Sequence, residues 1–364
     1  MTAGMPGDHR DWIASRRLHG QLLRGPRPAA AEDVVAHLTA MQAQEHGYAR
    51  WSVAQRSGDP AAAVVDRAFG DGRFLRTHVL RPTWHYVAAR DLRWLIGLSG
   101  PRVDAANTRQ YHDLGLDRDT LSRSAHLITG AVEHRPLTRR ELAAALDRRG
   151  MPARGVQLGC ILMHAELSAL ICSGPMQGRQ HTHAAFDQRV PATPGPSGDE
   201  ALAELAWRYF ATRGPATAGD FSWWSGLPAR DARAGLHLAQ ARLASHTADG
   251  RTYWFAERSL PPTPRPRIDL IQCYDESIIS YAKTRDVLQT AHATFAVPGY
   301  LDGFRHVLLI DGRLLGHWRP HPDDPGLVQT RTTMPLDRAG QKALEEAVDS
   351  YRRFSHPAPS ARGA

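Results

Sequence analysis

The sequence contains few cysteines, and they are isolated from one another. Cys160, Cys172 and Cys273 form no C-x-x-C pair. An odd number of unpaired thiols argues against a disulfide scaffold and against a structural zinc site, and it is typical of a protein in a reducing cytoplasm. We therefore expect a cytoplasmic protein without structural disulfides or structural zinc.

Long apolar runs are missing as well. Residues 1–10 lack the apolar stretch of a signal peptide, and no window approaches the uninterrupted apolar length that spans a bilayer. The sequence therefore predicts a soluble protein with no membrane partner.

Lysine is nearly absent from a basic chain. Of the 45 basic residues only Lys283 and Lys342 are lysines, and the formal net charge is +8. Arginine is the better fork for phosphate and guanine, so nucleic acid is a natural partner. A compositional bias from a GC-rich genome would give the same excess, and charge alone leaves both explanations open.

A plan of helix, turn, helix and hairpin is clearest over residues 134–186. Thr138 is an expected N-cap with Glu141 three residues on, and a helix is predicted over 139–149. A second helix is predicted over 156–170, followed by two strands around a glycine-rich turn. This order is that of a winged helix.

The same plan recurs earlier and later in the chain. The early copy has predicted helices over 30–44, 48–56 and 61–69, and the late copy ends in a hairpin turned at Asp249-Gly250. Proline-rich linkers separate the parts. The sequence predicts an α+β fold of tandem winged-helix (helix-turn-helix) domains over 1–115, 116–190 and 199–260, a C-terminal β-rich domain over 267–355 and a disordered tail over 356–364.

Gln42 and Gln44 stand at the end of the first predicted helix. Apolar residues from Val34 to Met41 follow helical spacing and run directly into the pair. A neutral amide is no general base at neutral pH, but it can hold a water by donating and accepting hydrogen bonds. The plainer interpretation is that both amides are solvated groups at a helix end.

Six short motifs occur in an order that is specific when taken together. With them the chain resembles the winged-helix DNA glycosylases of the AlkZ/YcaQ class over roughly residues 10–355. The motifs are Met41-Gln42-Ala43-Gln44, Leu80-Arg81-Pro82-Thr83-Trp84-His85, Asp91-Leu92-Arg93-Trp94, Asp220-Phe221-Ser222-Trp223-Trp224-Ser225-Gly226-Leu227, Tyr274-Asp275-Glu276, and Asp311-Gly312-Arg313 with Gly316-His317-Trp318. Cys273 departs from the pattern, because relatives tend to have proline there.

The resemblance implies a monofunctional, metal-free DNA glycosylase with a concave cleft. Its expected substrates are bulky N7-alkylguanine adducts or interstrand cross-links in double-stranded DNA, and Gln42 and Gln44 take the place of the family's catalytic Q-x-Q motif. A sister branch has Q-x-D, so Gln44 places the chain on the branch that resembles self-resistance proteins of producers of DNA-alkylating natural products.

The competing interpretation is a non-enzymatic winged-helix regulator. Such a protein would dimerise on a defined operator, whereas three tandem units suit a monomer.

Chemistry explains how two amides can be sufficient. Alkylation at guanine N7 makes the base cationic, so it departs as a neutral leaving group and much of the barrier disappears. Positioning a water and steadying the sugar cation are then the main tasks left to the protein. A lyase step would need an amine nucleophile, and neither Lys283 nor Lys342 lies near the motif.

Five arginines at predicted strand or helix starts or at a hairpin tip are candidate DNA contacts, since phosphate contacts are usual at such positions. They are Arg76, Arg81, Arg139, Arg140 and Arg313. Arg313 lies beside the Asp311-Gly312 turn, which is expected either to press into the DNA or to be an ordinary hairpin.

Other polar and aromatic motifs favour structural roles. Glu45 is either a carboxylate that assists the glutamine pair or, more simply, a charge that points to solvent. His85 is expected to fill a core, and Asp275-Glu276 to brace a packed element. Trp223-Trp224 are expected in a core rather than against bases. His181-x-His183 is a weak metal motif, because no cysteine or carboxylate cluster accompanies it.

Overall fold

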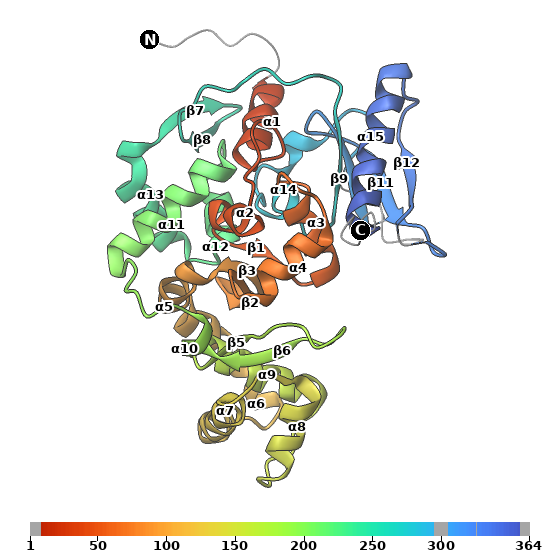
Figure 1. The fold of residues 1–364 in the computed structure, drawn as a ribbon. Helices are drawn as coiled ribbons and strands as arrows, with labels where there is room; N and C mark the ends of the chain where they lie inside the picture. The colour runs from red at the N-terminus through yellow and green to blue at the C-terminus, as the bar shows by residue number, and fades with distance from the viewer. Residues whose placement is uncertain (1–8, 295–304, 325, 357–364) are drawn as a thin grey trace.

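The computed structural model describes residues 9–294, 305–324 and 326–356, and it mixes helices with small antiparallel sheets (Figure 1). No helix among these residues is long and apolar enough to cross a lipid bilayer. Of the predicted tail, residues 357–364 lie outside the described residues.

Residues 31–88, called unit one, contain one helix, a short strand, two helices and a hairpin. The strands pair in the order β1-β3-β2, and Gln42 lies opposite His85. The elements are α2 (Ala31–Leu38), β1 (Met41–Gln42), α3 (His46–Ala54), α4 (Ala62–Gly70), β2 (Phe74–Val79) and β3 (Arg81–Ala88). The hairpin reverses at Leu80, whose φ is positive at 63°.

Residues 118–185, called unit two, repeat this order with the sheet order β4-β6-β5. The predicted N-cap is confirmed, because Thr138 and Glu141 form a reciprocal capping box at the start of α8. The elements are α7 (Arg118–Val132), β4 (Leu137–Thr138), α8 (Arg139–Asp147), α9 (Gly155–Leu167), β5 (Ile171–Ser173) and β6 (Thr182–Ala185). Unit two projects at the lower end of the molecule in Figure 1.

Three further helices join unit two to its neighbours. They are α5 (Ala89–Ala106), α6 (Thr108–Asp113) and α10 (Phe186–Arg189).

Residues 198–255, called unit three, show the order a third time. The hairpin at Asp249-Gly250 is confirmed, and both residues have positive φ. A bridge between Ala216 and Trp254 stands where the first strand lies in the other units. The elements are α11 (Gly198–Arg213), α12 (Ala218–Ser225), α13 (Ala229–Ala239), η1 (Gln240–Arg242), β7 (Ala244–Ala248) and β8 (Arg251–Phe255).

The C-terminal part holds the largest sheet, ordered β12-β11-β10-β9, and a long closing helix. The predicted hairpin at Asp311-Gly312 and the closing helix are both present. The elements are β9 (Ile268–Ile271), α14 (Glu276–Ile279), η2 (Arg285–Leu288), β10 (His306–Ile310), β11 (Arg313–Pro320), β12 (Val328–Thr332) and α15 (Arg338–Ser355).

The hydrophobic clusters cross the boundaries of these parts. Trp51 of unit one packs against Tyr351 of the C-terminal part, and both belong to a hydrophobic cluster that also contains Trp318. Trp224 of unit three belongs to a second cluster, which contains Leu92 of α5. Unit two has a cluster built mainly from its own helices and α5–α6. Units one and three and the C-terminal part are therefore packed as one body, and unit two is attached to it through α5 and through direct contacts of α9 and β5 with β2.

The N-terminal helix α1 (His9–Gly20) packs against this body rather than against unit one alone. Arg17 in α1 donates to the carbonyl oxygens of Pro215 at 2.9 Å and Thr284 at 3.1 Å.

The helix predicted over residues 30–44 is wrong at its C-terminal end. Helix α2 ends at Leu38, and Thr39, with φ of 64°, turns the chain into β1. Helical spacing continues to Met41 in the sequence. In the structure, however, Met41 and Gln42 pair with Tyr86 and His85 of β3, and a helix that continued to Gln44 would break this pairing. The glutamine pair consequently lies on an extended segment.

Candidate active site

Gln42 and Gln44 lie on the extended segment that follows α2. The Ala43 N–H donates to the Trp84 carbonyl oxygen at 2.7 Å, which continues the β1–β3 pairing past Gln42. Strand β1 itself ends at Gln42, which is only 9% exposed, whereas Gln44 follows in a bend and is exposed at the surface.

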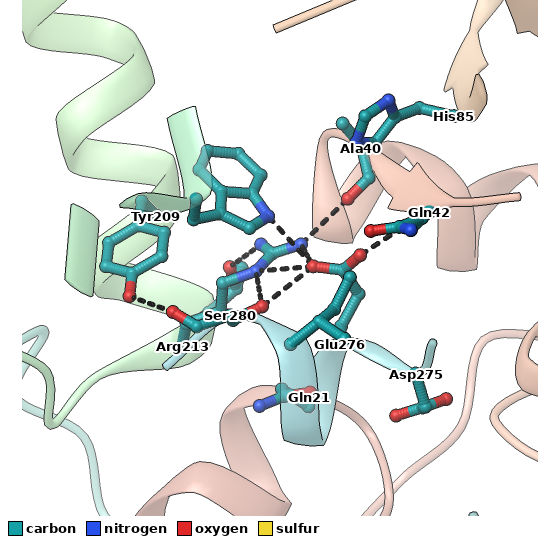
Figure 2. A network of polar contacts seen from close by, with 12 residues as sticks. Gln21, Ala40, Gln42, His85, Tyr209, Arg213, Asp275, Glu276 and Ser280 are labelled. Carbon is teal, nitrogen blue, oxygen red and sulfur yellow. Dashed lines mark hydrogen bonds and ion pairs between the residues drawn. The ribbon is translucent and has the colours of Figure 1, made fainter. Parts of the chain in front are cut away.

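Glu276 holds the buried end of this segment. Its Oε1 accepts the backbone N–H of Gln42 at 2.8 Å, and the side chain is 1% exposed. Figure 2 shows this carboxylate between Gln42 and the guanidinium of Arg213. Residues 234 positions apart thus fix the strand that carries the glutamines.

Arg213 pairs with the other carboxylate oxygen. Its Nη2 lies 2.7 Å from Glu276 Oε2 and also donates to the Ala40 carbonyl oxygen at 2.8 Å. The same Oε2 accepts from the Trp224 indole at 2.8 Å and the Ser280 hydroxyl at 2.8 Å. A buried carboxylate is stable only when paired and fully hydrogen-bonded, and unit three and α14 meet that requirement here.

Arg81 fixes the side chain of Gln42. Its Nη2 lies 3.1 Å from the Gln42 amide, and since guanidinium only donates, the facing atom is the amide oxygen Oε1. The same nitrogen faces Nε2 of His85 at 3.5 Å, while His85 Nδ1 lies 2.9 Å from the Thr83 carbonyl oxygen. Burial holds the pKa of His85 well below its ordinary value, so the ring is neutral. His85 is confirmed as a core histidine.

Arg76 supports the exposed end of the segment. Its Nε donates to the Ala43 carbonyl oxygen at 2.9 Å and its Nη2 to that of Gln44 at 3.2 Å. The guanidinium carbon lies 4.2 Å from the centre of the Trp84 ring. Burial lowers the pKa of Arg76, and the side chain is 9% exposed.

The side chain of Gln44 opens onto a groove of about 630 Å³ between units one and two. Pro82 and Trp84 line it from unit one, and Val156 and Met163 line it from α9. Val156 is 62% exposed, so an apolar wall faces the amide.

Unit two bears a concentration of exposed arginines beside this groove. Arg139 and Arg140 lie at the start of α8, and Arg139 also donates to the Gly155 carbonyl oxygen. Further exposed arginines continue the surface along the end of α8, the loop after it and the β5–β6 turn: Arg148, Arg149, Arg154 and Arg179. A surface of this charge is suited to a phosphate backbone.

Arg313 lies away from the groove. Its Nη1 donates to Asp11 at 2.9 Å and its Nη2 to the Gln289 carbonyl oxygen at 2.9 Å. A Cβ on Gly312 would lie 3.1 Å from Ala14, so the turn packs against α1. This geometry is that of the ordinary hairpin.

The structure also places the tryptophan pair and the acidic residues for which structural roles were predicted. Trp224 is fully buried as expected, but Trp223 is 51% exposed, so its core assignment is wrong. Glu45 precedes α3 and faces Arg305 at 3.7 Å with a partly exposed side chain. Asp275 braces the fold by pairing with Arg56 at 2.7 Å.

The two histidines of the weak metal motif lie near the groove. His183 Nε2 lies 3.4 Å from Glu166 Oε1, and the His181 ring packs against His46. Within the described part of the chain, no three His, Cys, Asp or Glu side chains are grouped to hold a metal ion.

Glu276 contacts the glutamine segment in a way that the sequence alone does not reveal. It was expected to brace a packed element, and the structure places that brace on Gln42 itself. The only sequence signal was its position in the Tyr274-Asp275-Glu276 motif, which says nothing about the partner. Arg213 carried no signal.

Comparison with known proteins gives consistent results. The model of the family described as DNA glycosylase AlkZ-like matches residues 35–354. An interstrand DNA cross-link repair glycosylase of Streptomyces sahachiroi is 24% identical over 316 residues, which cover 83% of this chain and 85% of that protein. The solved structure of the Streptomyces sahachiroi DNA glycosylase AlkZ superposes with a TM-score of 0.77 at 20% identity, covering 96% of this chain and 98% of that one.

Proposed function

Because the chain belongs to the AlkZ-like family of DNA glycosylases, we propose that it hydrolyses the N-glycosidic bond of bulky N7-alkylguanine adducts in double-stranded DNA. The name of the Streptomyces sahachiroi relative supports interstrand cross-links as further substrates. The Q-x-Q motif at Gln42 and Gln44 is the basis on which we further propose self-resistance to a DNA-alkylating natural product as the purpose. Family membership also favours an enzyme over a DNA-binding regulator.

One observation carries the proposal. Gln42 and Gln44 stand on one short segment whose backbone is anchored at one end by Glu276 and at the other by Arg76, and Gln44 lines a groove flanked by exposed arginines. A backbone anchored at both ends can position the amides to hold a water against a substrate with little reorganisation during the reaction.

The proposed step is simple and needs no cofactor. A water oxygen bonds to the sugar C1′ while the C1′–N9 bond breaks. The electron pair of the C1′–N9 bond moves onto the cationic base, which departs as neutral N7-alkylguanine. The water loses one proton to solvent. The Gln44 amide oxygen accepts from this water, and Gln42, whose oxygen already accepts from Arg81, offers its second lone pair and its amide N–H groups.

The architecture supports this proposal. We regard units one, two and three as tandem winged helices, because each has the same element order and units one and two have matching sheet orders. Three DNA-binding units in one chain favour a monomer. Lys283 and Lys342 are both exposed on other parts of the molecule, which favours a monofunctional enzyme over a lyase.

The five candidate arginines take different roles in this proposal. Arg139 and Arg140 contact DNA phosphates. Arg76 and Arg81 instead hold the catalytic strand and the Gln42 side chain, because their guanidinium groups are directed at these atoms. Arg313 fastens the β10–β11 hairpin to α1.

The test is single-turnover release of a bulky N7-alkylguanine from double-stranded DNA. Wild type should form abasic sites above spontaneous depurination, and the Gln42→Ala/Gln44→Ala double variant should not, although it still binds DNA. Absence of release by wild type on several adducts would refute the glycosylase on this substrate class. Activity that survives in the double variant would refute the site.

A further inference from the structure

A second cavity, of about 310 Å³, opens beside the Gln44 groove between units one and two. Arg76 and Trp84 line it from unit one, and His181 and His183 line it from the β5–β6 hairpin. Trp84 and Arg139 line both this cavity and the groove. The two spaces are therefore adjacent, on either side of the same residues.

Two residues that line this cavity each have a buried ring nitrogen with no hydrogen-bond partner among the described residues. The two nitrogens are the Nδ1 atoms of His181 and His183. Buried polar groups nearly always have a hydrogen-bond partner. Two ring nitrogens without one, on residues that line a cavity, therefore point to a ligand with its own hydrogen-bonding atoms.

The charged groups around the cavity favour an uncharged occupant over a cationic one. Arg76 and Arg139 both line it. The carboxylate there, Glu166, is already engaged by Nδ1 of His78 at 2.5 Å and by Nε2 of His183 at 3.4 Å. The cavity therefore suits an uncharged part of a substrate rather than its cationic base.

The wall of the cavity suits a neutral ring. Trp84 is held between the Arg76 guanidinium at 4.2 Å and the His78 ring at 4.5 Å, which fixes its plane. The His181 ring packs edge-on against His46 at 4.7 Å, and burial lowers its pKa to about 4, so it is an uncharged hydrogen-bonding partner at neutral pH. Aromatic walls with a few fixed polar atoms are the usual lining of small-molecule sites.

We propose that this cavity binds the substituent on N7 of the damaged guanine, and that it selects an uncharged aromatic ring bearing a hydrogen-bonding group such as a carboxamide. The inference rests on the proposed function, because it assigns the part of the substrate that the catalytic strand does not hold.

The experiment compares two adducts in the same duplex, N7-methylguanine and N7-(4-carbamoylbenzyl)guanine. The readout is the ratio of their kcat/KM values after subtraction of spontaneous depurination. Wild type should favour the carbamoylbenzyl adduct by about tenfold or more, the range expected for filling a preformed pocket. A variant that folds or binds DNA poorly lowers both values, so the ratio isolates the cavity.

Two variants change the cavity in different ways. His181→Leu keeps the volume and removes the ring nitrogens, and Gly159→Leu on α9 fills space, since its new side chain would meet only the end of the Arg139 side chain. Both should reduce the ratio to near one. Gly130→Leu is the matched control, because Gly130 is also helical, in α7, and has nothing within 4 Å of its Cβ position, so its ratio should equal that of wild type.

The outcomes separate the two proposals. A wild-type preference that disappears in both cavity variants and persists in Gly130→Leu supports the cavity. Release of both adducts at a ratio that the cavity variants leave unchanged, or a wild-type preference for N7-methylguanine, overturns the cavity and leaves the glycosylase standing. Release of neither adduct by wild type overturns the proposed function together with the inference.

Discussion

The two glutamines of the motif are separated by a single residue, yet they lie in opposite surroundings. Gln42 is 9% exposed, with Glu276 on its backbone and Arg81 on its amide oxygen. Gln44 is exposed on a groove whose opposite wall belongs to unit two. The end at Gln42 is fixed by charged side chains from distant parts of the chain, and the end at Gln44 is left open to substrate. We therefore expect substitutions at the buried end of this three-residue segment to change the stability of the protein, and substitutions at the exposed end to change only its activity.

The largest effect is expected on the buried side. Glu276→Gln keeps the shape of the side chain but leaves Arg213 buried without its counterion, which typically costs about 3–5 kcal/mol. Urea unfolding measures the loss. Glu45→Gln is the control, because Glu45 faces Arg305 at 3.7 Å with both side chains partly exposed, and it should change the free energy of unfolding by only about 0–1 kcal/mol. Equal effects of the two substitutions would contradict the comparison.

Single substitutions of the glutamines should separate stability from activity. Both Gln42→Ala and Gln44→Ala should reduce single-turnover base release by about a hundredfold, because a misplaced nucleophile costs this much. Only Gln42→Ala should also lose stability, by about 1 kcal/mol, since it removes an acceptor of the partly buried Arg81. Parallel kinetics and urea unfolding test this. A Gln44→Ala protein as destabilised as Gln42→Ala would show that the open side is structural too.

The arginines of unit two should act on DNA binding rather than on stability. Arg139→Ala/Arg140→Ala should weaken binding to undamaged and alkylated duplexes alike and reduce the slope of log affinity against log salt by about two. Fluorescence anisotropy at several salt concentrations measures this. Arg313→Ala is the control, because its guanidinium is engaged by Asp11 and Gln289, and it should leave the slope unchanged. A slope that falls in Arg313→Ala instead would place the hairpin on DNA.

The smallest effect expected is a pH dependence from the histidines between units one and two. Burial lowers the pKa of His46 to about 3 and that of His181 to about 4, against an ordinary value near 6.5. Between pH 6.5 and about 4 the unfolded chain binds protons at these positions and the folded protein does not, so stability falls as pH falls. Urea midpoints at pH 7 and pH 5 measure the slope.

Substitution of His181 tests whether this dependence of stability on pH comes from a histidine that lines the cavity. His181→Leu should make it shallower, whereas His126→Leu on the exposed surface of α7 should not change it. An unchanged slope in His181→Leu would remove that ring as a source of the effect.

The local signals in the sequence were reliable where the cause is local. The capping box at Thr138 and Glu141 and the turn at Asp249-Gly250 depend on neighbouring residues, and both are present as predicted. The end of α2 failed because Met41 continues the helical spacing while its pairing partner, Tyr86, lies on a distant strand. Trp223 failed for a related reason, since its helix buries Trp224 and leaves its neighbour at the surface.

The sequence by itself determined the order of helices and hairpins, the position of the glutamine motif and the basic character of the chain, because spacing, turn residues and charge are local properties. Only the tertiary structure decided that Glu276 and Arg213 anchor the strand of Gln42, that Arg76 and Arg81 support that strand, and that Gln44 faces unit two. These contacts join residues from about 30 to more than 200 positions apart, and a single sequence carries no periodicity or spacing that specifies such pairs.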